Sequence, residues 1–350
     1  MKLKPSQNLQ KYHTLAIPVK AKEIVVINTQ KKLAEFIDNE KKYQPRIILG
    51  FGSNSVFLKE YPGYVIIIRF GGYRFQNINK NKVSLQVNAG AKWNNLAWNC
   101  LKRNLWGTEN LVEIPGSLGA AIIQNIGAYG QEIKNLVNWV EYIDLKTKTK
   151  HRLYNSDCSF GYRDSIFKDS KKYKSGNFVI TRIELILSKK PSPILNYPDL
   201  RNYFSNSNIK KISILEIAKA VKKIRKSKIP PQTKFANAGS FFKNIIVDKQ
   251  KIDRLIKIYP TMPYFKEIQK NMTKYKIPTG WLIENIGLRG YKYHSAEVSS
   301  INASILGINK ANKVKNPKNA DDLSFLIDYI KKTVYQKYQL KLEPEVQIYQ

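Results

Sequence analysis

The chain has 350 residues, of which 43% are hydrophobic and 11% aromatic, so it is long enough for two or three domains and too apolar for a disordered protein. No run of about 18 apolar residues occurs, and no apolar segment follows the basic N-terminal residues, so we expect neither a membrane span nor a secretory signal. The formal net charge of +34 suggests nucleic-acid binding, but the lysines are spread along the whole chain without a recognition motif, which disfavours that class.

Strands and helices are predicted throughout the first half of the chain. Val83, Leu85 and Val87 alternate with polar residues, which is typical of a half-buried strand. The predicted strands cover residues 23–27, 46–49, 64–69, 83–87, 139–145 and 178–187, and the predicted helices cover residues 29–38 and 93–103.

The second half begins where the Pro-Ser-Pro sequence at 191–193 interrupts the pattern and predicts a boundary. Beyond it, apolar residues at helical spacing predict a helix over 214–224 and another that begins near Asp321 or Asp322. Residues 342–349 alternate apolar and polar side chains, which predicts a strand docked into a sheet. We therefore expect an α+β chain of two broad regions.

The segment from Ile114 to Gly130 is uncharged in a protein otherwise crowded with lysine. It contains four glycines, namely Gly116, Gly119, Gly127 and Gly130. Glycine marks positions where the backbone approaches a neighbour closely or adopts a positive φ. We interpret the segment as backbone wrapped around a flat or anionic ligand, with a tightly packed turn region as the alternative.

A second glycine-containing loop, Gly50-Phe-Gly-Ser-Asn-Ser55, follows a predicted strand and is similar to a degenerate dinucleotide-binding fingerprint. A Rossmann unit requires a helix directly after the glycines and an acidic residue about 20 positions further on. Here another strand follows, and Arg69 and Phe70 stand near the expected acidic position. A Rossmann fold is therefore disfavoured, although the loop can still present N–H groups to a diphosphate.

Three polar residues stand in contexts that suit catalysis. Arg163 lies among aromatic residues in a loop and suits bidentate capture of a carboxylate, with a structural ion pair as the alternative. Ser240 lies between a glycine and two phenylalanines, where an apolar setting favours proton donation, with a plain Gly-Ser turn as the alternative. Glu345 would be held in place by a docked C-terminal strand. The three histidines stand in unremarkable contexts, so no histidine-based triad is predicted.

The two cysteines, Cys100 and Cys158, are too few for a disulfide framework and show no metal-ligand spacing. We therefore expect a cytoplasmic protein without a metal site.

In their order along the chain, these segments resemble the UDP-N-acetylenolpyruvoylglucosamine reductase (UDP-N-acetylmuramate dehydrogenase) family over nearly the whole length. The motifs that carry the resemblance are Ile-Pro-Gly at 114–116, Gln-Asn-Ile-Gly-Ala-Tyr-Gly at 124–130, Gly-Tyr-Arg-Asp-Ser at 161–165, Ala-Gly-Ser-Phe-Phe-Lys-Asn at 238–244 and Glu-Pro-Glu-Val at 343–346. Tyr197 looks like the substrate-capping tyrosine of the longer subtype of this family.

The resemblance implies an α+β fold with an FAD-binding domain of the vanillyl-alcohol-oxidase type in two subdomains, followed by an α+β substrate-binding domain. The FAD-binding region would span 1–190, with subdomains at about 1–72 and 73–190. The substrate-binding domain would span 191–350, and its tail 341–350 would return Glu345 to the active site.

The resemblance also implies FAD as cofactor and NADPH as the reductant that reduces it. The implied FAD-binding residues are Gly50, Gly52, Ser53, Asn54, Ser55, Pro115, Gly116, Ser117, Gly119, Gln124, Asn125, Gly127 and Arg225. The implied substrate-binding residues are Tyr129, Tyr162, Tyr197, Lys228 and Asn244.

By resemblance, Ser240 donates the proton, while Arg163 and Glu345 bind and polarise the enolpyruvyl carboxylate of UDP-N-acetylglucosamine enolpyruvate. The expected product is UDP-N-acetylmuramate, a peptidoglycan precursor, and the expected state is a monomer. The departures from the family pattern are Ala236, His294-Ser295, Asn302 and Gln347, which concern secondary contacts with flavin or substrate. Two alternatives stay open at this point: another flavin oxidase or dehydrogenase of the same fold, and a basic nucleic-acid-binding protein.

Overall fold

The computed structural model describes residues 6–168, 176–208, 211–269, 272–310 and 318–350. The contacts divide the chain into two compact units. The first unit comprises Met1–Gln7, Lys20–Gly52 and Tyr61–Lys226, and the second comprises Asn8–Val19, Ser53–Glu60 and Ser227–Gln350.

The first unit contains a sheet of strand order β1-β2-β5-β3. Its strands are β1 (Gln7–Asn8), β2 (Lys20–Ile27), β5 (Tyr61–Ile68) and β3 (Arg46–Leu49), and the last three run parallel. The continuous apolar run at 64–68 is typical of a strand that is covered on both faces, and all five residues are buried. Helix α1 (Gln30–Asp38) packs Leu33 and Phe36 into the same core. Its first turn is capped by Thr29, whose Oγ1 accepts the Lys32 N–H at 3.1 Å.

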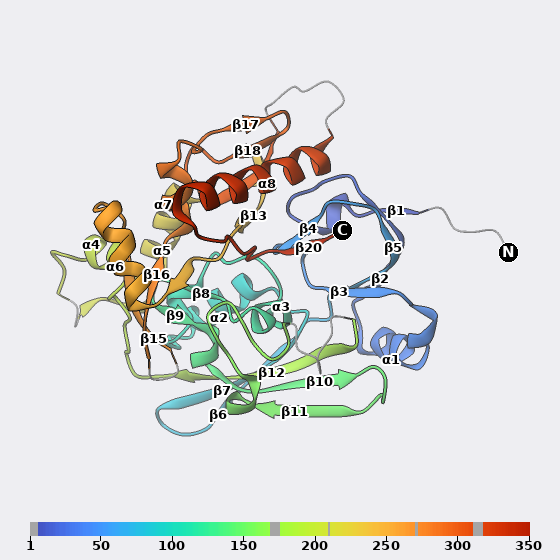
Figure 1. Ribbon diagram of the computed structural model, residues 1–350. Helices are drawn as coiled ribbons and strands as arrows, with labels where there is room; N and C mark the ends of the chain where they lie inside the picture. The colour runs from blue at the N-terminus through green and yellow to red at the C-terminus, as the bar shows by residue number, and fades with distance from the viewer. Residues whose placement is uncertain (1–5, 169–175, 209–210, 270–271, 311–317) are drawn as a thin grey trace. The chain divides into compact units, whose positions relative to one another are not determined.

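The second sheet of this unit is antiparallel, with the order β11-β10-β12-β7-β6. Its strands are β11 (Lys150–Tyr154), β10 (Val137–Asp144), β12 (Phe178–Ser188), β7 (Lys82–Asn88) and β6 (Tyr73–Asn77). Helices α2 (Trp93–Lys102) and α3 (Leu118–Ile123) lie over one face of the sheet (Figure 1). The remaining elements are β8 (Gly127–Ala128), β9 (Gln131–Glu132), α4 (Pro198–Tyr203) and α5 (Ile214–Lys228).

Helices α4 and α5 belong to the core of the first unit, although the sequence placed a boundary at 190. Leu200 of α4 and Ile217 and Val221 of α5 are fully buried in the cluster that also contains Leu85 of β7. Because these apolar contacts extend beyond the two prolines at 191–193, the compact unit ends at Lys226. The assignment of the two regions to flavin and substrate stays a prediction.

The second unit is built on a sheet of order β13-β19-β18-β17. Its strands are β13 (Phe235–Ser240), β19 (Ile305–Asn309), β18 (Ala296–Val298) and β17 (Lys292–Tyr293). Helix α8 (Asn319–Tyr338) packs on this sheet, with Leu323, Leu326 and Ile330 fully buried on one face. A three-stranded sheet follows, formed by β14 (Ile245–Val247), β16 (Met272–Ile277) and β15 (Phe265–Gln269), together with α6 (Lys249–Ile258) and α7 (Thr279–Asn285).

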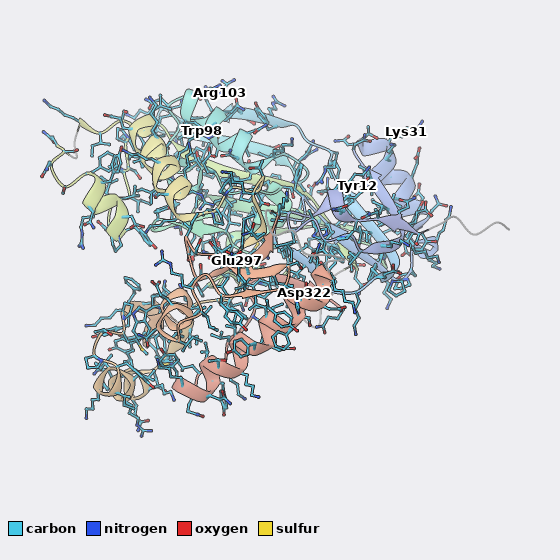
Figure 2. All side chains as sticks on the ribbon, turned by 90° about the horizontal axis from the view of Figure 1, so that it is seen from above. Tyr12, Lys31, Trp98, Arg103, Glu297 and Asp322 are labelled. Carbon is cyan, nitrogen blue, oxygen red and sulfur yellow. The ribbon has the colours of Figure 1, made fainter. Side chains whose placement is uncertain are left out.

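Two buried carboxylates fix the β17–β18 turn and its neighbours. Asp322 Oδ2 on α8 accepts hydrogen bonds from the backbone N–H of Ser295 at 3.2 Å and from its hydroxyl at 2.7 Å. Glu297 on β18 accepts from Asn309 Nδ2 at 2.7 Å (both acids are labelled in Figure 2). His294 in the same turn adopts φ 49°, a left-handed conformation that glycine adopts without strain. Glycine at position 294 would therefore relieve backbone strain in this turn.

The C-terminal strand is shorter than predicted. Residues 347–349 form β20 (Gln347–Tyr349), which pairs in parallel with β4 (Ser55–Phe57), whereas the expected strand began at Leu342. Pro344 has no N–H to donate to a ladder, so it confines the regular strand to the residues after it. The other predicted strands and helices are confirmed, with ends that differ by a few residues. Within the described ranges, no helix is long and apolar enough to cross a membrane.

Burial strongly shifts the pKa values of both cysteines and of one histidine. Burial raises the pKa of the Cys100 and Cys158 thiols, both in the first unit, to about 12. In the second unit, burial lowers the pKa of His13 to about 4. The His13 ring packs edge-on against Phe57, its Nε2 lies 3.1 Å from the Ile17 carbonyl oxygen, and its Nδ1 is buried without a partner.

We expect the second unit to lose stability in acid because of His13. The folded state favours the neutral His13 ring, whereas in the unfolded chain the ring has its ordinary pKa of 6.5. As the pH falls below 6.5, the unfolded chain therefore binds the proton before the folded protein does, which favours unfolding. The free energy of unfolding should fall by about 3 kcal/mol between pH 6.5 and 4. Urea titrations of wild type and His13→Leu across this range measure the effect. An equally steep pH dependence in the variant would contradict it.

Candidate active site

The predicted site residues fall into both compact units. The first unit contains Gly50, Gly52, Pro115, Gly116, Ser117, Gly119, Gln124, Asn125, Gly127, Tyr129, Tyr162, Arg163, Tyr197 and Arg225. The second contains Ser53, Asn54, Ser55, Lys228, Ser240, Asn244 and Glu345.

The start of α3 is tied to the loop between β7 and α2. The N–H groups of Leu118 and Gly119 donate to the carbonyl oxygens of Ala91 and Ala89 at 2.9 and 2.8 Å. Ser117 caps the helix, because its Oγ accepts the Ala120 N–H at 3.4 Å. These first-turn donors are therefore already engaged by the protein itself.

Each of the four glycines in the 114–130 segment meets a requirement of the fold. Gly116 and Gly130 have φ values of 123° and 85°. A Cβ on Gly119 would lie 2.9 Å from the Ala89 Cβ, and one on Gly127 would lie 2.9 Å from Glu132 Cγ. The tightly packed turn region thus accounts for the glycines, while contact of this segment with a ligand stays a prediction.

Asn125 joins this segment to the loop that presents Arg163. Its Nδ2 donates to the Gly161 carbonyl oxygen at 2.8 Å, and its Oδ1 accepts the Lys134 N–H at 3.1 Å. Gly161 and Asp164 bond to each other across a tight turn whose tip is Tyr162-Arg163. Arg163 has φ 53°, and its Nη2 donates to the Gly127 carbonyl oxygen at 2.7 Å. The guanidinium is thus held against the glycine segment by a backbone conformation that non-glycine residues rarely adopt.

Tyr129 and Arg225 form the centre of a buried cluster in the first unit. The Tyr129 hydroxyl and the Arg225 guanidinium are hydrogen-bonded, and the Tyr197 ring stands edge-on to Tyr129 with centroids 5.3 Å apart. Burial raises the pKa of Tyr129 to about 12. Burial also lowers the pKa of Arg225, as does the nearby Arg163, whereas Tyr129 and Glu113 oppose this effect. The structure therefore brings together four of the predicted residues.

The surroundings of Arg225 fit a flavin. Its Nε is buried and has no hydrogen-bond partner in the protein. Because buried polar groups almost always find a partner, this donor is suited to an acceptor from a bound ligand. The carbonyl and phosphate oxygens of FAD are acceptors of this kind.

A cavity of about 550 Å³ opens in the first unit beside the Gly50 loop. Its lining includes the Phe51 ring, with the Arg69 guanidinium 3.6 Å from the ring centroid and Lys92 Nζ 5.5 Å from it. The Arg69 Nη1 also donates to the Gly50 carbonyl oxygen at 2.5 Å. The cavity therefore places two cations beside the predicted cofactor loop, which suits an anionic ligand.

In the second unit, a β-bulge lies just before Ser240, the last residue of β13. Asn237 pairs with Gly307 and Ser240 pairs with Ile305. Between these two pairs, β13 therefore has one residue more than β19. Gly239, within the bulge, has φ 79°, which glycine adopts without strain. The Ser240 hydroxyl is exposed at the end of β13, 3.2 Å from the Ser304 hydroxyl.

The same unit brings Glu345 beside the residues that follow Ser240. The Glu345 N–H donates to the Phe241 carbonyl oxygen at 2.8 Å, and the Lys243 N–H donates to the Glu343 carbonyl oxygen at 2.9 Å. Asn54 Nδ2 donates to the Glu345 carbonyl oxygen at 3.3 Å. The predicted proton donor and the predicted glutamate therefore lie on paired segments, as a docked tail requires.

Two further predicted residues have defined structural contacts. Asn244 Oδ1 accepts from the N–H and the hydroxyl of Thr279 at 3.1 and 3.2 Å, at the start of α7. The carbonyl oxygen of Lys228 accepts from Asn302 Nδ2 at 3.4 Å. The predicted substrate contacts of Asn244 and Lys228 stay predictions.

Sequence reasoning missed Ser304 and Lys92. Lys92 precedes a helix and resembles the many other lysines of the chain. Ser304 is near Ser240 only because β13 and β19 pair with a bulge. The residues next to Lys92 and Ser304 in the sequence form no motif that would have identified either one as part of the site.

Comparisons with known proteins identify two matching domain families in the chain. Residues 21–151 match an FAD binding domain, and residues 230–349 match the C-terminal domain of UDP-N-acetylenolpyruvoylglucosamine reductase. The chain is therefore an FAD-dependent oxidoreductase of α+β fold, as the family resemblance implied.

Full-length relatives define the family. The chain is 42% identical over 347 residues to UDP-N-acetylenolpyruvoylglucosamine reductase of Buchnera aphidicola subsp. Acyrthosiphon pisum, covering 98% of this chain and 92% of that protein. It is 38% identical over 335 residues to the enzyme of Wigglesworthia glossinidia brevipalpis, covering 96% and 94%. The crystal structure of the Thermus caldophilus enzyme shares the fold, with a TM-score of 0.67 and 21% identity over 99% and 98% of the two chains. The chain belongs to the UDP-N-acetylenolpyruvoylglucosamine reductase family.

We expect Gly50→Ala to destabilise the first unit. The added Cβ would lie 2.2 Å from Ser117 Oγ, which would displace the cap of α3. Overpacking of this kind lowers the free energy of unfolding by about 1–3 kcal/mol. Gly71→Ala is the matched control, because its Cβ would have its nearest neighbour at 3.7 Å. Equal urea midpoints for the two variants would rule out the proposed clash.

Proposed function

We infer that this protein catalyses the FAD-mediated reduction of UDP-N-acetylglucosamine enolpyruvate to UDP-N-acetylmuramate, with NADPH as reductant, in peptidoglycan precursor biosynthesis. The observation that carries this proposal is the likeness to reductases of this name over nearly the whole chain, together with Ser240 and Glu345 on paired segments. The substrate is a small molecule.

FAD, when bound, supplies hydride transfer between NADPH and the enolpyruvyl double bond. We propose that Arg225, with its unpartnered Nε, and the residues of the Gly50–Ser55 loop and the 114–130 segment hold the cofactor. Arg69 and Lys92, which line the adjacent cavity, add positive charge beside that loop.

Within this proposal, Arg163 binds the substrate carboxylate and stabilises the negative charge that grows toward the transition state. Interactions that strengthen in the transition state are those that raise the rate. The Arg163 backbone is locked in a turn and its Nη2 is anchored on Gly127, so the guanidinium is oriented before substrate binds. Glu345 acts with Arg163 to bind and polarise the carboxylate.

Ser240 donates the proton to the enolpyruvyl C2 while C3 receives the hydride. Its position at the end of a bulged strand, followed by two buried phenylalanines, holds the backbone of Ser240 in place. We further propose that Tyr197 closes over the bound substrate, as in the longer subtype of the family. The edge-on contact of Tyr197 with Tyr129 and the 42% exposure of its side chain support this role.

We also propose that the enzyme works as a monomer in the cytoplasm and does not bind nucleic acid. The two buried free thiols suit a reducing compartment. The 60 lysine and arginine residues are distributed along the chain, which suits general attraction of anionic nucleotides more than a nucleic-acid groove.

The decisive experiment follows the two half-reactions of the flavin separately. The purified protein should be yellow, its flavin absorbance should bleach with NADPH, and the enolpyruvyl substrate should restore it. Ser240→Ala should bleach normally but recover roughly 10²- to 10⁴-fold more slowly, because only the proton donor is lost. Protein that cannot take up FAD would exclude the proposed activity. Normal recovery in the variant would remove Ser240 from the mechanism.

Arg163→Lys should slow recovery of the flavin by the enolpyruvyl substrate about 10²-fold and weaken substrate binding, because an ammonium group cannot make the bidentate contact of a guanidinium. Bleaching by NADPH should change little. Arg152→Lys is the control, since Arg152 is a half-exposed arginine of the same unit that stacks on Trp139 at 4.2 Å. Equal recovery rates in both variants would argue against carboxylate binding by Arg163.

A further inference from the structure

A second hydroxyl stands directly behind Ser240. Ser304 Oγ lies 3.2 Å from Ser240 Oγ and 2.8 Å from Asn302 Oδ1. The three side chains therefore form a hydrogen-bonded row in the second unit, from the end of β13 to the turn before β19.

The backbone fixes the direction of the hydrogen bonds in this row. The Ser304 N–H donates to Asn302 Oδ1 at 3.0 Å, so this atom of the amide must be the acceptor oxygen. A carbonyl oxygen cannot donate, so the Ser304 hydroxyl must give its single proton to Asn302. Ser304 Oγ can then only accept from Ser240. In the resting protein Ser304 Oγ is therefore an acceptor for the Ser240 hydroxyl.

Ser304 itself is held in place on both sides. Its carbonyl oxygen accepts the Phe241 N–H at 2.8 Å, and Phe241 is the residue after Ser240. Gly280 of α7 lies on another side, where a Cβ would be 3.4 Å from the Ser304 Cβ. The backbone of Ser304 is thus fixed, while its hydroxyl hydrogen can turn from Asn302 to Ser240 once the Ser240 oxygen has lost its proton.

We propose that Ser304 is a positioning residue that stabilises Ser240 when Ser240 gives up its proton, an inference that rests on the proposed function of Ser240. As the Ser240 O–H bond breaks and the C2–H bond forms, the electron pair stays on Ser240 Oγ. The Ser304 hydroxyl turns from Asn302 to this oxygen and donates a hydrogen bond to the developing alkoxide. The Ser240 alkoxide then takes up a proton from solvent, which is the proton that the reduction consumes together with the hydride. A donor aimed at charge that appears only in the transition state accelerates the step.

The test is a set of variants at Ser304 assayed by flavin absorbance in the FAD-loaded enzyme. Ser304→Ala should leave bleaching by NADPH and the dissociation constant of the enolpyruvyl substrate unchanged, while flavin recovery slows about 10- to 100-fold. Ser304→Thr, which keeps the hydroxyl, should retain most of the recovery rate. The solvent deuterium isotope effect on recovery should rise in Ser304→Ala, because proton transfer becomes more rate-limiting.

Ser299→Ala is the matched control. Ser299 lies in the same β18–β19 turn, and its Oγ accepts the N–H groups of Ile301 and Asn302 at 3.2 and 3.4 Å. Loss of this hydroxyl perturbs the turn without removing the partner of Ser240. If Ser304→Ala and Ser299→Ala slow recovery equally, with unchanged isotope effects, Ser304 has only a structural role and the inference is overturned.

The outcome for Ser240→Ala separates the two proposals. Slow recovery in Ser240→Ala together with wild-type recovery in Ser304→Ala overturns the role of Ser304 alone. Normal recovery in Ser240→Ala overturns the proton-donor assignment and, with it, the inference about Ser304.

Discussion

The first unit depends on two places where the backbone passes too close to a neighbour for a side chain to fit. Gly119 approaches Ala89, and Gly50 approaches Ser117, so the Gly50 loop, the loop after β7 and the start of α3 converge. The resulting hydrogen bonds satisfy the first N–H groups of α3 within the protein. From this fixed point the segment continues to Asn125, which sets the Arg163 turn, and to Tyr129, which meets Arg225. The geometry of the predicted site in this unit therefore follows from close packing of the chain itself.

In the second unit, backbone pairing plays the corresponding role. Ser240 is exposed just after the bulge at Gly239, and the next three residues pair with Glu343–Glu345. The tail is in turn secured by β20 against β4, which connects the last residues of the chain to the segment just after the Gly50 loop. A glutamate near the C-terminus is thus as firmly placed as one inside a sheet. This arrangement also explains why Pro344 is tolerated, since the neighbouring residues supply the hydrogen bonds.

Local sequence patterns predicted the helices and strands well. The features that these patterns missed depend on contacts between residues far apart in the sequence. The apolar residues at 64–68 predicted β5, the helix predicted over 29–38 is α1, and the strand directly after the Gly50 loop correctly excluded a Rossmann unit. The glycines at 114–130 were recognised as special, but the reason for Gly119 is Ala89, which a sequence pattern cannot reveal. The unit boundary depends on where α5 buries its apolar face. The family resemblance is confirmed, whereas the roles of Arg163, Ser240 and Glu345 stay predictions.

The burial of both thiols gives the protein a built-in reporter. Cys100 and Cys158 lie in the first unit, where burial keeps them protonated and shielded at neutral pH, while the second unit has no cysteine. A thiol-reactive dye added to the native protein will therefore record the opening of the first unit alone. The rate of labelling can be compared with the rate at which intrinsic fluorescence changes on unfolding. This comparison distinguishes sequential unfolding of the two units from a single cooperative transition.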